Sequence, residues 1–138
     1  MEDFQDAAKR HLDDAELLLA QSPPRLANAS HLFGISAECS LKAIGTNSKK
    51  PGVSFNPFDG GHIGSRLFAE LSNVTKMGAS GNLVLKLDTL ESANYFSSWS
   101  VNQRYAPQTA FVHATVLQQQ AGAKSAFLLM TNCLLGLM

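Results

Sequence analysis

The chain has 138 residues, of which 45% are apolar, and this is enough for one domain around one core. Eleven Lys and Arg balance eleven Asp and Glu, which excludes the broadly basic surface of a nonspecific nucleic-acid binder and makes any RNA contact local. The acidic start lacks a signal-peptide pattern, and the apolar stretch 126–138 is shorter than the roughly 20 residues of a membrane span. We expect a single cytoplasmic domain over residues 1–138, without membrane contact, in which Cys39 and Cys133 are buried free thiols.

The first half of the sequence predicts a helical hairpin. Apolar residues at spacings of three and four indicate a helix over 3–21, capped by Asp3, and a second over 25–44, ended by Gly45. Pro23 and Pro24 stop the first helix and suit the start of the second, so the two are expected to be antiparallel. The predicted inward residues are Phe4, Ala8, Leu12, Ala15 and Leu18, then Leu26, Ala29, Phe33, Ala37, Leu41 and Ile44.

The second half predicts three further helices. Turn-forming residues make 46–61 the main loop, and a third helix is expected over 62–75 with Ile63, Leu67, Leu71 and Val74 inward. Segment 82–98 fits both a strand and a helix, and we favour a helix because no second strand is evident to pair with it. Pro107 is expected to start the last helix, with an inward stripe of Ala110, Ala114, Leu117, Ala121, Lys124, Leu128 and Cys133 or Leu134. The fold class is therefore all-α, an antiparallel bundle of about five helices.

Four segments resemble, in the same order, the HEPN family of small helical-bundle proteins. They are 7–18 (AAKRHLDDAELL), 36–44 (SAECSLKAI), 61–67 (GHIGSRL) and 102–107 (NQRYAP), and the second, with Glu38 before Leu-Lys-Ala, is the strongest match. The resemblance implies a four-helix up-and-down core, a homodimer, a nucleotide or RNA ligand, and no metal or other cofactor. It also implies a nucleotidyltransferase partner, as in toxin–antitoxin type systems. Phe127, Leu128, Leu134, Leu135 and Leu137 are apolar candidates for the dimer interface.

The resemblance also implies a candidate ribonuclease site. Ribonucleases of the family use an arginine and a histidine a few residues apart, one to contact phosphate and one to activate the ribose hydroxyl. The nearest counterparts here are Arg104 and His113, whose eight intervening residues put them out of phase on a continuous helix. If Arg104 precedes the helix, it can fold back toward a phosphate at the helix N-terminus. The alternatives are an ion pair for Arg104 and a near-core position for His113, so activity as a metal-independent endoribonuclease stays open.

Six further residues are candidates for ligand or phosphate binding. Glu38 and Lys42 have the spacing of a helical ion pair, although Glu38 can instead bond Arg104 or Tyr105. His62 and Arg66 are also four apart and suit an acid–base and phosphate pair, or else His62 caps a helix. Trp99 and Tyr105 can stack on bases or plug the end of the bundle.

Several enzyme classes lack support in the sequence. A di-iron bundle needs Glu-x-x-His, but the residues three beyond Glu38, Glu70 and Glu91 are Leu41, Asn73 and Asn94. No P-loop, dinucleotide fingerprint or Gly-x-Ser-x-Gly elbow is present. A further alternative to the RNA-associated dimer and the ribonuclease is a noncatalytic structural or small-ligand-binding bundle.

Overall fold

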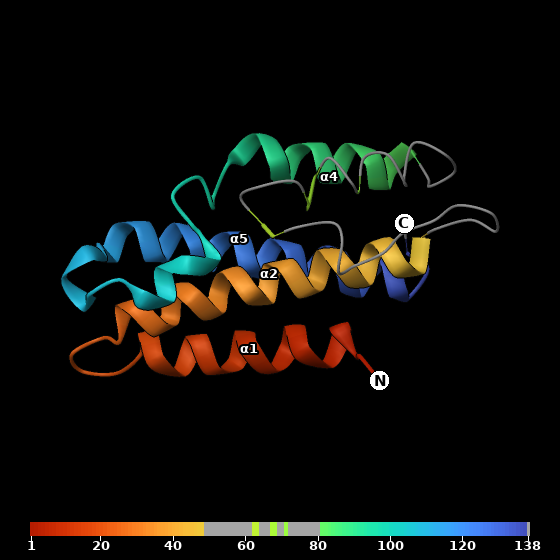
Figure 1. Cartoon of the computed structure of the whole chain (residues 1–138). Helices are drawn as coiled ribbons and strands as arrows, with labels where there is room; N and C mark the ends of the chain where they lie inside the picture. The colour runs from red at the N-terminus through yellow and green to blue at the C-terminus, as the bar shows by residue number, and fades with distance from the viewer. Residues whose placement is uncertain (49–61, 64–66, 69–70, 72–80, 138) are drawn as a thin grey trace.

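The computed structural model describes residues 1–48, 62–63, 67–68, 71 and 81–137, and its regular elements are all helical (Figure 1). The α-helices are α1 (Phe4–Leu19), α2 (Leu26–Ser48), α4 (Gly81–Ala93) and α5 (His113–Leu134). Two short 3-10 helices, η1 (Val101–Tyr105) and η2 (Gln108–Ala110), connect α4 to α5. The predicted all-α bundle is confirmed, while most of the predicted loop and third helix lies outside the described residues.

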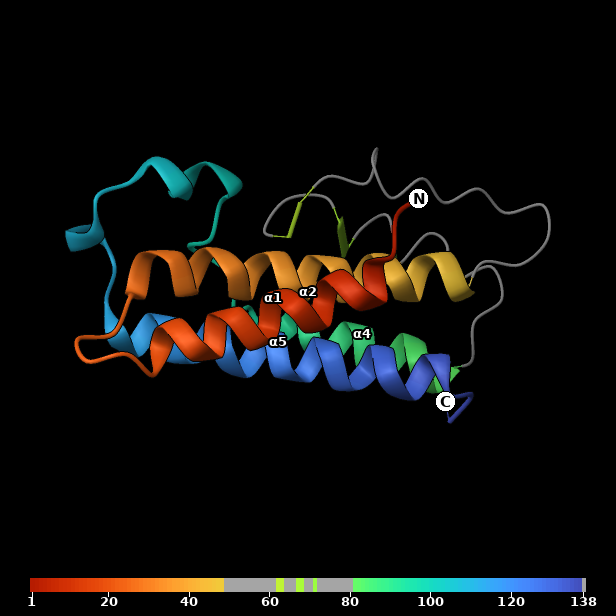
Figure 2. The ribbon, with the colours of Figure 1, turned by 90° about the horizontal axis from the view of Figure 1, so that it is seen from below.

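The four α-helices of the described residues run in two opposite directions. In Figures 1 and 2, α1 and α4 run one way and α2 and α5 the other. The Ser36 hydroxyl donates to the Ala8 carbonyl at 2.7 Å, which joins α2 to α1. Glu16 of α1 accepts from Gln120 at 2.6 Å and pairs with Lys124 at 3.1 Å, which joins α1 to α5. The result is an up-and-down arrangement in which α1 lies along both α2 and α5 (Figure 2).

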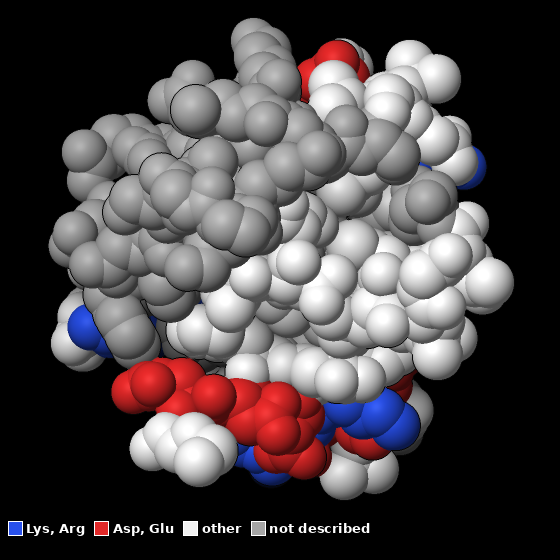
Figure 3. Space-filling model, turned by 90° about the vertical axis from the view of Figure 1, so that its right-hand side faces the viewer, with Lys and Arg blue, Asp and Glu red and all other residues white. Residues whose placement is uncertain are grey.

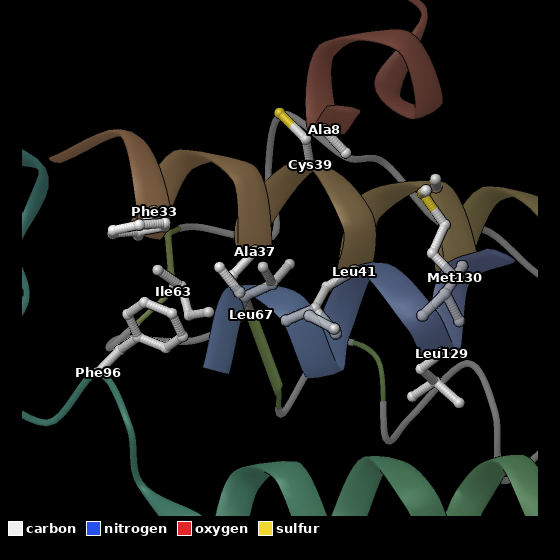
Figure 4. Close-up of a cluster of buried hydrophobic side chains, with 14 of the residues drawn as sticks. Ala8, Phe33, Ala37, Cys39, Leu41, Ile63, Leu67, Phe96, Leu129 and Met130 are labelled. Carbon is white, nitrogen blue, oxygen red and sulfur yellow. The ribbon is translucent and has the colours of Figure 1, made fainter. Parts of the chain in front are cut away.

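Helix α2 is the centre of the bundle. It contacts α1, α5, η1 and η2, and its predicted inward residues from Ala29 to Ile44 are fully buried. Its other faces are buried as well, including Ser36, Glu38, Ser40 and Lys42. Figure 4 shows apolar side chains of α2 facing those of other segments, among them Phe33, Ala37, Leu41, Ile63, Leu67, Phe96, Leu129 and Met130. The three described residues of the predicted third inward stripe, Ile63, Leu67 and Leu71, are buried too.

Three predicted helix boundaries are wrong. α2 does not end at Gly45 but continues to Ser48, because Gly45 is buried inside the bundle and adopts no left-handed cap. α4 ends at Ala93 rather than Ser98, since Asn94 takes the left-handed conformation with φ 56°. Pro107 precedes η2 instead of starting the last helix, and α5 begins at His113.

The predicted inward stripe of the last helix is also wrong. Leu117 and Leu128 on that stripe are 44% and 61% exposed, and Lys124 is at the surface in its pair with Glu16. The buried face instead carries Val116, Gln119, Gly122, Ala123, Ala126, Leu129 and Met130. Small residues there admit close neighbours, since a Cβ at Gly122 would lie 2.7 Å from the Cβ of Tyr95.

The helix predicted at 82–98 is confirmed as α4, which buries Leu83 and Leu87 on one side. Exposed Leu85 belongs to the strand-like alternation of the sequence, which the fold does not use. None of the described helices combines the length and apolar character that crossing a membrane requires.

Candidate functional site

Glu38 is the centre of a buried polar cluster on α2. Its Oε2 atom accepts from Lys42 Nζ at 3.0 Å, and its Oε1 atom lies 2.9 Å from His62 Nδ1 and accepts from the Ile63 amide at 3.1 Å. The Glu38 and Lys42 side chains are only 7% and 10% exposed, so the predicted ion pair forms in the core rather than in solvent. The alternative bonds from Glu38 to Arg104 or Tyr105 are not formed. Both carboxylate oxygens are occupied, and they hold residues 62–63 against α2.

The thiol beside this cluster is not set up as a nucleophile. Burial, and after it the Glu38 carboxylate, raise the pKa of Cys39 to about 11, because Lys42 and Arg10 only partly oppose them. Cys39 is thus a neutral thiol at neutral pH. Cys133 is half-buried, and its Sγ lies 3.3 Å from the Ser48 hydroxyl. Both cysteines are free, as predicted, but Cys39 is buried and Cys133 only partly so.

Trp99 plugs one end of the bundle. Its indole is 4% exposed, and Nε1 donates to the Ser30 carbonyl at 3.0 Å. The ring stacks on His31 with centroids 6.0 Å apart and lies against Gly34, where an added Cβ would be 2.0 Å from the indole. These protein contacts favour the plugging role over base stacking for Trp99.

Arg104 and Tyr105 lie at the same end, on η1, and face solvent. The Arg104 guanidinium carbon lies 4.9 Å from the centroid of the Tyr105 ring, and Tyr105 is 76% exposed. No ion pair joins Arg104 to the described acidic residues.

His113 is the first residue of α5 and is exposed, so its predicted near-core alternative is wrong. The two candidate catalytic residues do not share a helix, because η2 lies between Arg104 and His113 in the chain. In the described part of the chain, no hydrogen bond joins them. Arg66, the partner predicted for His62, lies outside the described residues.

His31 is a residue that the sequence did not single out. Its ring stacks on Trp99, and its Nδ1 atom is buried without a hydrogen-bond partner. Burial lowers the pKa of His31, the positive charges of Arg104 and His11 lower it further, and Glu38 opposes them. His31 is neutral at pH 7. No local pattern links it to Trp99, since the two are far apart in the sequence.

A second polar cluster lies beside Trp99, and the sequence did not predict it. Ser30 of α2, Gln103 of η1 and Gln119 of α5 are joined through the Ser30 hydroxyl, which accepts from Gln103 Nε2 at 2.7 Å and donates to Gln119 Oε1. Only Gln103 belongs to a segment that the sequence singled out, the NQRYAP motif. Three glutamines in succession, 118–120, carry no signal for which one is buried.

The polar groups at this end of the bundle include a guanidinium, a phenol ring and side-chain amides. In the described ranges, no group of three His, Cys, Asp or Glu side chains is arranged to hold a metal ion. The cationic plane of Arg104, the ring of Tyr105 and the amide cluster all lie on or beside η1. No protein-family model, curated protein or solved structure matches this chain.

Proposed function

We propose that the protein is a HEPN-like dimer that contacts RNA or a nucleotide at the end of the bundle formed by η1, η2 and the start of α5. The observation that carries this proposal is the exposed Arg104–Tyr105 pair. A guanidinium donates to phosphate oxygens, and an exposed ring stacks on an unpaired base. The pair offers both contacts within one segment, without a broadly basic surface.

Among the described residues, the charges favour this end of the molecule over the opposite one. Figure 3 shows the end that holds both termini, where acidic side chains, with some basic ones beside them, gather along one edge. The chain starts there with Glu2 and Asp3, and Asp6 follows in the first turn of α1. A phosphate backbone is repelled by such an edge. Arg104 lies on η1, away from these acidic residues (Figure 1).

The dimer is proposed to form through the exposed face of α5. Leu117, Ala121 and Leu128 recur at helical spacing along this face, and Leu135 follows at the end of the helix. All four are exposed, and Lys124 lies among them in its pair with Glu16. Such a stripe is unusual for a helix that packs only against its own chain. A second copy that presents the same face would bury it by two-fold symmetry.

The RNA contact is tested with a fluorescein-labelled hexauridylate in an anisotropy titration. Arg104→Ala and Tyr105→Ala are each expected to weaken binding about tenfold, because one removes a phosphate contact and the other a stacked base. Arg104→Ala should also reduce the slope of log K against log salt by about 0.7. Arg10→Ala, which removes an exposed arginine from α1, is the matched control. Binding that is unchanged in both η1 variants would refute the proposed surface.

The same titration separates binding from cleavage. RNA that stays intact fits a binding component, as in the proposed nucleotidyltransferase or toxin–antitoxin type system. RNA cleaved by the wild type, but by neither Arg104→Ala nor His113→Ala, would make the protein the metal-independent endoribonuclease that the resemblance allows. Light scattering of the wild type and of Leu128→Glu tests the dimer. A monomeric wild type at micromolar concentration would refute it.

A further inference from the structure

A cavity of about 370 Å³ opens between η1, η2 and the start of α5. Its volume is within the range of roughly 300–1,000 Å³ that is typical of small-molecule sites. The amide cluster of Ser30, Gln103 and Gln119 lies on one side of it. The other lining is mostly apolar and includes Phe111, Val112 and Val116. A polar patch within apolar walls is the usual design of a specific ligand pocket.

The hydrogen bonds of the cluster engage each of its side-chain oxygens once and leave an amide donor without an acceptor among the described residues. The Ser30 hydroxyl donates its only hydrogen to Gln119 Oε1, and Gln103 Oε1 accepts from the Ser100 amide at 3.1 Å. Gln119 is only 2% exposed, yet its Nε2 hydrogens have no acceptor among the described residues. Its Nε2 atom is thus a donor that stays available in the lining of the cavity. An acceptor atom placed in the cavity would receive a hydrogen bond from this amide.

The N-terminus of α5 adds further donors at the same cavity. Val112 occupies the N-cap position and offers no side-chain acceptor. The amides of His113, Ala114 and Thr115 therefore have no acceptor in the described part of the chain. Val112 and Thr115 both line the cavity, so this helix end borders it. The two independent sets of donors, from Gln119 and from α5, call for a ligand with several acceptors.

The lining also limits the ligand's charge. The described residues around the cavity include no Lys, Arg, Asp or Glu. An ionised group would lose its water without gaining an opposite full charge, which is unfavourable. A neutral carbonyl oxygen or ring nitrogen meets the donors without that cost. The Phe111 ring and the Val116 side chain suit a flat molecule whose faces are apolar.

We propose that this cavity, defined by Ser30, Gln103, Phe111 and Gln119, binds an uncharged flat ring that carries carbonyl acceptors, of the pyrimidinedione type. The carbonyl oxygens accept from Gln119 Nε2 and from the first amides of α5, and the ring lies against Phe111. This site goes beyond the proposed RNA contact, because it needs neither Arg104 nor Tyr105.

The test is a titration with uracil, followed by calorimetry and by NMR of the side-chain amide of Gln119. Uracil is expected to bind and to shift the Gln119 amide signals. Gln119→Leu should weaken binding about tenfold through the lost hydrogen bonds. Gln118→Leu makes the same change at the exposed neighbouring position and should leave binding unchanged. Ala106→Leu fills part of the cavity without removing any of the hydrogen bonds above, and should abolish binding.

Two other probes test the chemistry of the ligand. Toluene has a similar ring without acceptors, and orotate is the uracil ring with an added carboxylate, so both should bind at least about tenfold more weakly than uracil. Orotate that binds more tightly than uracil would overturn the uncharged class. A wild type that fails to bind uracil at millimolar concentration would overturn the site. Equal affinity in the wild type and in a folded Gln119→Leu variant would overturn it as well.

A final arm identifies the source of the ring. Competition between uracil and hexauridylate would show that a base of RNA enters the cavity. Independent binding of the two would assign the cavity to a free small molecule. Loss of hexauridylate binding in Arg104→Ala with intact uracil binding would separate this site from the proposed RNA surface. Intact hexauridylate binding without uracil binding would leave the RNA proposal standing and refute this one.

Discussion

Two polar clusters on α2 differ in how completely the protein satisfies them. Around Glu38, each carboxylate oxygen has a partner on Lys42, His62 or Ile63. Around Ser30, the oxygens are satisfied, but the Gln119 amide hydrogens point to no acceptor in the described chain. The first cluster is closed and belongs to the fold. The second borders a cavity, so it is the better candidate for function.

The largest expected effect comes from breaking the closed cluster. Glu38→Leu leaves the Lys42 ammonium buried without a partner and should lower the free energy of unfolding by about 3–5 kcal/mol. Asp13→Leu breaks the exposed pair with Lys9, which has the same i, i+4 spacing, and should cost less than about 1 kcal/mol. Urea unfolding measures both. Similar losses in the two variants would show that the cluster is not closed.

The next largest effect concerns the packing of Trp99 against Gly34 of α2. Gly34→Ala places a Cβ 2.0 Å from the Trp99 ring, so the indole must move, and we expect a loss of about 3 kcal/mol in urea unfolding. Gly81→Ala is the control, because nothing lies within 4 Å of a Cβ there. If both substitutions are neutral, the packing of Trp99 on Gly34 is incorrect.

A smaller effect is expected in the open cluster. Ser30→Ala removes the hydroxyl that links Gln103 to Gln119 and should cost about 1–2 kcal/mol, less than at Glu38 because the groups are uncharged and border a cavity. Ser92→Ala, at an exposed position of α4, should change the stability by less than about 0.5 kcal/mol. A loss at Ser30 as large as that at Glu38 would remove the distinction between the clusters.

The smallest effect is a pH dependence. The pKa values of His31 and His11 are lowered in the fold, mainly by burial, so the unfolded chain takes up protons first as the pH falls below 6.5. Stability should therefore decrease between about pH 7 and about pH 5.5. His31→Gln should reduce this decrease, as measured by the urea midpoint at the two pH values. A variant with the same pH dependence as the wild type would contradict the shift at His31.

The parts of the fold that were predictable depend on local signals. Pro23, Pro24 and the apolar spacing around them are enough to define the α1–α2 hairpin. α5 carries apolar residues on two faces, Leu117 and Leu128 on one and Val116 and Met130 on the other. Only the position of α2 decides which face is buried. Sequence periodicity selected the wrong one.

The contacts of the candidate site also differ in whether local sequence spacing predicts them. Glu38 and Lys42 are four residues apart, so their contact follows from helix geometry alone. Ser30 and Gln119 are 89 residues apart, and their contact depends on the packing of α2 against α5. The exposed Arg104–Tyr105 pair was singled out through the resemblance, but its exposure on a 3-10 helix was not predictable from Pro107.

The position of Trp99 has a spectroscopic consequence. It is the only tryptophan of the chain, and its Nε1 atom is bonded to the backbone of Ser30. Intrinsic tryptophan emission from the protein therefore comes from Trp99 alone, next to the amide cluster and close to η1 in the chain. The protein contains its own fluorophore for occupancy of that end, and a titration can be followed without an added label.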